Sequence, residues 1–145
     1  MKKSKTILIM VLALNILLLV GCGQKLGEEF TEEVNTLEGV SLTVDAESVA
    51  SSGITYTLDN QSDKDINFGQ NYSLQMEKDG KWYQVESQDP MAVTLELLWL
   101  PAGTSDTYEI KWDSSYGKLS SGNYRIVKNV SDEENGYYLA GEFQL

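Results

Sequence analysis

From Val40 onward, apolar and polar residues alternate along the chain. Val40, Leu42 and Val44 are separated by single polar residues, and this alternation predicts a strand with one buried face. Similar short runs follow at residues 53–60, 66–68, 72–78, 81–85, 107–112, 123–130 and 137–145. The pattern therefore predicts seven or more short strands and no long helix.

The segments between these runs have the composition of turns. Asp79-Gly80 separates two alternating runs, and because both residue types tolerate positive φ, this pair is a strong β-hairpin signal. Polar segments separate other runs, at 47–52, 60–65 and 131–136. Short strands with turns about every 8 to 12 residues are typical of a β-sandwich. We therefore expect one all-β, antiparallel sandwich domain of about seven strands over residues 40–145.

One segment lacks the alternation. Residues 95–100 read "LELLWL" and contain Leu95, Leu97, Leu98, Trp99 and Leu100. A strand buried on both faces has this composition, and so has an apolar surface that binds a partner. We favour the buried strand, with the partner surface as the alternative.

The first residues follow a different pattern. Three lysines within the first five residues precede an apolar run over residues 6–20. A positive start and a short apolar core are typical of a secretory signal peptide, and a membrane-spanning helix needs a longer run of about 20 residues. Residues 23–38 then hold five glutamates without alternation. We expect residues 22–39 to be an acidic tether, which repulsion from anionic lipid would extend.

The only cysteine of the chain, Cys22, directly follows the apolar run and Gly21. Leu19-Val20-Gly21-Cys22 resembles the bacterial lipobox. The resemblance implies a lipoprotein signal peptide over residues 1–21, with diacylglycerol joined to the Cys22 sulfur before cleavage. Acyl chains of the palmitate type would then attach the protein to the extracytoplasmic face of the cell membrane. The alternative is an ordinary signal peptide in which Cys22 is incidental.

Charge and composition narrow the possible functions. The first 21 residues hold three of the eleven basic residues and none of the 22 acidic ones, so the rest of the chain has a formal charge of −14. This charge argues against nucleic acid as a partner, because phosphates need basic patches. The chain has no histidine, which excludes the Ser-His triad, the Cys-His dyad and histidine zinc sites. We expect neither an enzyme nor a bound cofactor or metal.

Acidic turns and aromatic residues are the remaining candidate sites. Two acidic clusters lie in predicted turns: Asp59, Asp63 and Asp65, and Asp132, Glu133 and Glu134. The first could bind Ca²⁺, but the glycine and glutamate of a calcium loop do not follow at the required spacing, so we interpret both as solvated loops. A platform for a glycan or peptide could include Trp82, Tyr83, Trp112, Tyr116, Tyr137 and Tyr138. In a sandwich most aromatic residues serve the core.

A second resemblance lies near the C-terminus. Leu119-x-x-Gly122-x-Tyr124 is similar to the tyrosine corner of Ig-like sandwiches, in which the tyrosine hydroxyl binds upstream backbone; the alternative is an ordinary strand tyrosine. Over residues 40–143 the chain resembles the bacterial Ig-like domain of small lipoproteins of Gram-positive bacteria. The matching stretches are "YTLDNQSDKDINFGQNYSLQ", "GKWYQV", "LPAGTS", "IKW…YGKL", "GNYRIVK" and "YYLAGEF".

The resemblance implies an Ig-like fold and no catalytic residues, since a sandwich by itself names no activity. We expect a membrane-anchored lipoprotein that carries one non-enzymatic binding or structural module, with an unidentified protein or envelope component as its partner. The alternative is a protease inhibitor with an Ig-like fold, because residues 58–66 and 100–105 also resemble one such group.

Overall fold

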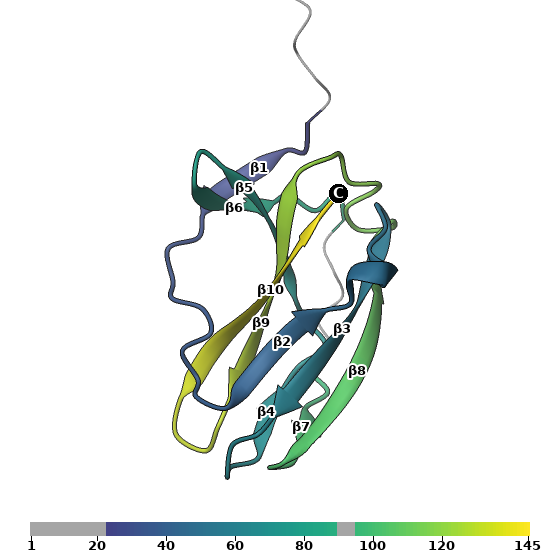
Figure 1. Cartoon of the computed structure of the whole chain (residues 1–145). Coiled ribbons are helices and arrows are strands. Elements are labelled where there is room, and N and C mark those ends of the chain that lie inside the picture. Colours follow the sequence, from purple (N-terminus) through teal and green to yellow (C-terminus); the bar gives the residue numbers. More distant parts are fainter. Residues whose placement is uncertain (1–22, 90–94) are drawn as a thin grey trace, which may run out of the picture.

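The structure is a computed structural model that describes residues 23–89 and 95–145. These residues form two β-sheets packed face to face (Figure 1). Every strand pairing within them is antiparallel. The all-β sandwich that the alternation predicts is confirmed.

The larger sheet has seven strands, which are β1 Leu26–Glu29, β4 Ile66–Phe68, β5 Ser73–Lys78, β6 Lys81–Val85, β7 Leu98–Leu100, β9 Asn123–Ser131 and β10 Gly136–Gln144. Their order is β1-β6-β5-β9-β4-β7, with β10 paired to the other side of β9. β9 is thus the central strand, because β10 pairs along its whole length while β5 and β4 share its opposite side.

The smaller sheet has three strands, which are β2 Val40–Val44, β3 Gly53–Asn60 and β8 Thr104–Lys111. β3 lies between the other two, and the short 3-10 helix η1 (Ala46–Ser48) connects β2 to it. β2 packs against β10 of the larger sheet. On the opposite side of the sandwich, β7 and β8 are the edges of their sheets and contact each other.

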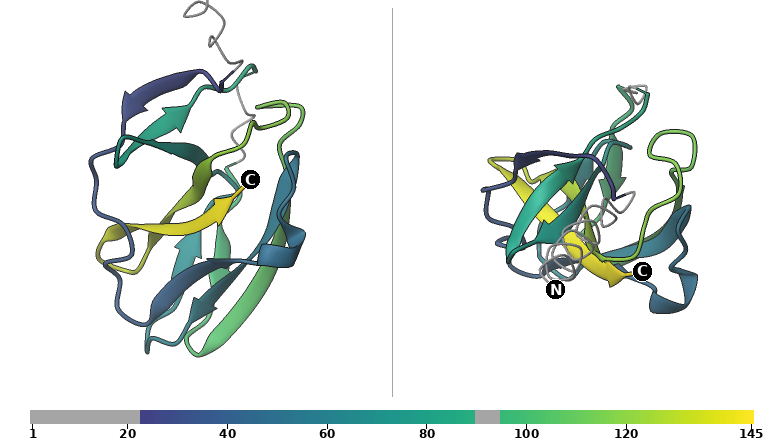
Figure 2. Two further views of the ribbon diagram at one scale, coloured as in Figure 1. Left: turned by 45° about the horizontal axis from the view of Figure 1, so that its top comes forward. Right: turned by 90° about the horizontal axis from the view of Figure 1, so that it is seen from above.

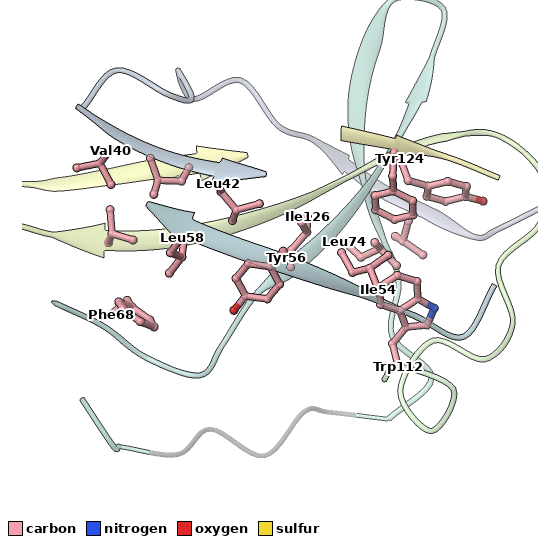
Figure 3. Close-up of a cluster of buried hydrophobic side chains, with 14 of the residues drawn as sticks. Val40, Leu42, Ile54, Tyr56, Leu58, Phe68, Leu74, Trp112, Tyr124 and Ile126 are labelled. Carbon is pink, nitrogen blue, oxygen red and sulfur yellow. The ribbon is translucent and has the colours of Figure 1, made fainter. Parts of the chain in front are cut away.

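The core lies between the two sheets and is built from alternate residues of the central strands. In β3, Ile54, Tyr56 and Leu58 are buried, while the residues between them are partly exposed. Side chains from β2, β5 and β9 meet them there (Figure 3). Burial of apolar surface stabilises such a core by about 25 cal/mol per Å². The alternation in the sequence therefore identifies the face that holds the sandwich together.

The hairpin predicted at Asp79-Gly80 is confirmed. These residues join β5 to β6, with φ of 54° and 75°, and Lys78 pairs with Lys81 across the turn. Positive φ at both central positions gives the tight turn whose twist matches the flanking strands.

The strands differ from the prediction in number. Each stretch in which alternation predicts a strand contains one, but the described residues contain ten strands and not about seven. β1, of four residues, lies where no strand is expected. β7 lies within residues 95–100, where a strand is expected, and has three residues.

The segment before residue 40 also differs from the predicted tether. β1 pairs with β6, so the chain joins the larger sheet within a few residues of position 23 (Figure 2). The Phe30 ring then packs edge-on against Tyr138 at 5.2 Å, and the Asn35 amide bonds the Ala140 backbone N and O at 2.9 and 3.2 Å. The five glutamates remain exposed. These contacts hold the segment on the sheet. The glutamates do not oppose this arrangement, because their carboxylates stay in solvent while the segment lies on the sheet.

The favoured interpretation of residues 95–100, a strand buried on both faces, is wrong. Leu100 is buried, whereas Leu95, Leu97 and Trp99 are 97%, 53% and 58% exposed. The physical reason is that a two-layer sandwich buries only the inner face of each sheet. Trp99 alternates with Leu98 and Leu100 on β7 and lies on the other face, while Leu95 and Leu97 precede the strand.

Candidate functional site

A lysine occupies an inward-facing position of the central strand β9. Tyr124, Ile126 and Val130 alternate along the core face of this strand and are fully buried. Lys128 shares their alternation and is only 1% exposed. On one side of β9 the ladder is interrupted beside this lysine, because β5 pairs only before it and β4 only after it. The connection formed by residues 69–72 therefore faces Lys128.

The Lys128 ammonium binds this connection directly. Its Nζ donates hydrogen bonds to Gly69 O at 2.8 Å and to Asn71 O at 2.9 Å, which uses two of its three N–H groups. It also lies 5.3 Å from the centroid of the Phe68 ring, within cation–π range. Within the described residues no carboxylate forms a salt bridge with it. Lys128 is thus a buried cation held by neutral groups.

Lys128 is one of the residues that line a pocket of about 450 Å³ between the two sheets. The other lining residues are Tyr56, Phe68, Gln70, Tyr72, Leu98, Tyr108, Glu109, Ile110 and Lys111. Tyr56 stacks on Tyr108 at 5.4 Å between ring centroids, and Tyr108 meets Phe68 edge-on at 5.8 Å. In Figure 3, Phe68 lies toward one end of the core and Trp112 toward the other, with Tyr56 between them. Aromatic residues therefore make up four of the ten residues that line the pocket, beside charged, polar and aliphatic ones.

Burial shifts the pKa of the groups around the pocket. Loss of water around the ammonium lowers the pKa of Lys128 to about 8. Desolvation is also the main cause that raises the pKa of Tyr72 and of Tyr108 to about 12. The pKa of Tyr56 is raised further, by desolvation first and then by the neighbouring Tyr108 and Tyr72. At neutral pH the pocket therefore holds one buried ammonium and three neutral hydroxyls.

Large apolar residues are exposed near this pocket. They are Leu95, Leu97 and Trp99, in β7 and the segment before it. Exposed apolar residues that gather in one region are typical of an interaction surface. β7 lies at the end of the sandwich opposite to β1 (Figure 1). The N-terminal end of the domain and its exposed apolar strand are thus far apart.

The residues of the predicted tyrosine corner come together beside the C-terminus. Tyr124 is fully buried, and its hydroxyl donates to Ser120 O, four residues upstream, at 2.8 Å. Leu119 is buried, and Gly122 exchanges two backbone hydrogen bonds with Leu145, each of 3.0 Å. The geometry matches the bond expected for a tyrosine corner. Its contribution to stability stays a prediction.

Tyr124→Phe should lower the free energy of unfolding by about 1 to 3 kcal/mol, because the ring remains while the Ser120 carbonyl loses its buried donor. Urea midpoints at unchanged slope measure this loss. Tyr108→Phe is the control, since its hydroxyl bonds an exposed Asp106 carboxylate at 3.1 Å and water can replace it. Equal midpoints for Tyr124→Phe and wild type would show that Tyr124 is an ordinary strand tyrosine.

The acidic clusters serve local structure. Asp65 Oδ1 accepts a hydrogen bond from Ala102 N at 2.9 Å, and Asp59 Oδ1 accepts one from Gln61 Nε2 at 2.7 Å. Asp132 accepts bonds from the backbone N of Glu134 and of Asn135, which lower its pKa. Within the described residues no three acidic or cysteine side chains form a group that could hold a metal ion.

The predicted aromatic residues do not form one platform. Trp112 and Tyr116 are buried in the core. Trp82 covers the Arg125 guanidinium on the outer face of the larger sheet, 4.4 Å from the ring centroid. Tyr138 packs against Phe30 there. The aromatic residues thus divide between the core and the outer face of the sheet.

The sequence prediction for the lipid attachment site, Leu19 to Cys22, lies outside the described residues. In the opposite sense, Lys128 is a pocket residue that the sequence prediction missed. A signal for it exists, because Lys128 stands at an alternate position with Tyr124, Ile126 and Val130 in an otherwise apolar face.

The fold and the pocket define a class: a single antiparallel β-sandwich with a lateral pocket, suited to binding or to a structural role. The model of the bacterial Ig-like domain family matches residues 36–144. The chain therefore belongs to the bacterial Ig-like domain family, which supports a non-enzymatic binding or structural module. None of the curated proteins compared with the chain matches it.

Proposed function

We propose that the protein is a lipid-anchored, extracytoplasmic binding module without enzymatic activity, of the kind found in small lipoproteins of Gram-positive bacteria. The observation that carries this proposal is the motif Leu19-Val20-Gly21-Cys22, placed behind a signal-like segment and before a domain of the bacterial Ig-like family. The lipid on Cys22 would attach the protein to the membrane. Its partner would be a protein or another envelope component, and not a nucleic acid.

The position of β1 supports this arrangement. Only residues 23–25 separate Cys22 from β1, and three residues span at most about 11 Å. A lipid on Cys22 would therefore hold the β1 end of the sandwich close to the bilayer. β7, with its exposed apolar residues, would then point away from the membrane (Figure 1). The formal charge of −14 after the signal would keep the domain from lying on anionic lipid.

Among the described residues, no helix is long and apolar enough to span a bilayer.

A protease inhibitor with an Ig-like fold is the alternative function. No feature of the described loops favours it, so it remains a hypothesis. Titration of the protein against a panel of proteases tests it.

Cys22→Ala should abolish lipid attachment, because alanine offers no sulfur for the thioether. Cells that express the full chain would be fed radiolabelled fatty acid, and the label that migrates with the protein would be measured. Gly23→Ala is the matched control, since it changes the next residue and keeps the thiol. Normal labelling of Cys22→Ala would contradict the anchor.

A further inference from the structure

We propose that the pocket around Lys128 binds the carboxylate of a small ligand that has a flat, apolar body. The proposal rests on the binding function proposed above and names its ligand class. It does not depend on the lipid at Cys22, since all the residues that carry it belong to the sandwich.

The ammonium of Lys128 has no opposite charge to compensate it among the described residues. Lys128 is 1% exposed and lines the pocket, yet its two hydrogen-bond acceptors, Gly69 O and Asn71 O, are neutral. A buried charge is costly unless an opposite charge compensates it. The third N–H of the ammonium remains for an acceptor in the pocket. An anionic oxygen there would supply both the missing charge and the missing acceptor.

Several residues that line the pocket suit a flat, apolar group. Tyr56, Tyr72, Tyr108 and Phe68 present aromatic surface, and Leu98 and Ile110 add aliphatic surface. Aromatic faces and edges pack well against flat apolar groups. The tyrosine hydroxyls stay protonated at neutral pH because their pKa values are raised. The hydroxyls of Tyr56 and Tyr72 are thus available as donors to a carboxylate that the ammonium holds, whereas that of Tyr108 donates to Asp106 Oδ2 at 3.1 Å.

The volume of the pocket and the net charge of its lining residues suit a small monocarboxylate. A volume of about 450 Å³ falls in the lower part of the range of small-molecule sites, roughly 300 to 1,000 Å³. The lining residues include two lysines and one glutamate, and Lys111 pairs with Glu109 at 3.2 Å. One net positive charge remains, that of Lys128. It matches a monocarboxylate better than a phosphate, whose charge near neutral pH is about −1.5 to −2.

The simpler role of Lys128 is structural, as the donor that satisfies the two carbonyls of the β4–β5 connection. This role predicts no preference for an anion. A pair of probes of equal shape and different charge separates the two roles. Phenylacetate and phenylacetamide share the aromatic ring and differ only in the carboxylate.

The experiment is a titration of the full chain in a nonionic detergent with each probe, followed by NMR of the tyrosine rings and the Lys128 side chain. Phenylacetate should shift the resonances of Tyr56, Tyr72 and Tyr108 to saturation, and bind at least about tenfold more tightly than phenylacetamide. It should also raise the pKa of Lys128, because an anion stabilises the charged form.

Two variants test whether Lys128 causes the preference for phenylacetate over phenylacetamide. Lys128→Gln keeps an amide donor for the carbonyls and removes the charge, so its ratio of the two affinities should fall to about one. Lys111→Gln removes an exposed charge on the same pocket and should change the ratio less than about twofold. Equal binding of the two probes by wild type, no binding of phenylacetate, or an unchanged pKa of Lys128 would overturn the proposal. These wild-type results decide it even if Lys128→Gln does not fold.

The same experiment on the Cys22→Ala chain keeps the two proposals apart. Carboxylate binding should be equal with and without the lipid, because Cys22 belongs to none of the elements that form the pocket. Loss of binding in this variant would contradict the inference that the sandwich alone forms the site. Failure of lipidation in the wild-type chain, with carboxylate binding retained, would contradict only the anchor.

Discussion

Leu58→Ala should lower the free energy of unfolding by about 2 to 5 kcal/mol. Leu58 lies in β3, the middle strand of the smaller sheet, and its side chain is fully buried between the two sheets. Truncation removes apolar area from the core and leaves a cavity that the surrounding strands fill only in part. A domain of this size has a total stability of roughly 5 to 15 kcal/mol, so the loss is a large share of it.

Urea denaturation of the variant, at unchanged slope, measures this effect. Leu95→Ala is the matched control, because it makes the same chemical change at a side chain that is 97% exposed. The control should stay within about 0.5 kcal/mol of wild type. A loss in Leu95→Ala as large as in Leu58→Ala would contradict the assignment of these two leucines to surface and core.

Gly53→Ala should destabilise the protein by about 3 kcal/mol, because the added methyl group has no space. A Cβ at Gly53 would lie 2.2 Å from the carbonyl oxygen of Ile110 in β8. This neighbour is backbone and cannot rotate away, so the end of the β3–β8 pairing must open. Trp112 would be disturbed as well, since its backbone N and its Nε1 bond Ser52 O and Ser51 O, each at 2.9 Å.

Gly69→Ala is the control for this substitution. A Cβ there would meet only Asn71 N, at 3.9 Å, which is ordinary van der Waals contact. Thermal or urea unfolding should therefore place Gly69→Ala close to wild type and Gly53→Ala far below it. Equal stability of the two variants would contradict the close approach of β3 and β8 at Gly53 in the structure.

The strands could be predicted from the sequence where one face of a strand is buried and the other is not. In β3 the alternation of apolar residues is a direct consequence of the sandwich, and the Asp79-Gly80 turn depends on local backbone chemistry alone. Both kinds of information are local in the chain. The sandwich class could therefore be predicted without any knowledge of the strand order.

The features that could not be predicted depend on contacts between distant residues. The N-terminal segment lies on the sheet because Phe30 meets Tyr138 and Asn35 meets Ala140, more than 100 residues away. Trp99 is exposed because only one face of β7 turns to the core, and Leu95 lies outside the strand. Lys128 is buried because the ladder of β9 is interrupted beside residues 69–72. The first two arrangements have no periodic signal in the sequence, and the alternation of Lys128 with Tyr124, Ile126 and Val130 indicates an inward position without showing which residues face it.

The central claim is that an Ig-like binding module is held at the membrane by lipid on Cys22. The most direct test is the intact mass of the protein isolated from membranes of bacterial cells that express the full chain. We expect a chain that begins at Cys22, with the added mass of a diacylglycerol on that residue. A chain that begins at another residue, or that carries no lipid on Cys22, would contradict it.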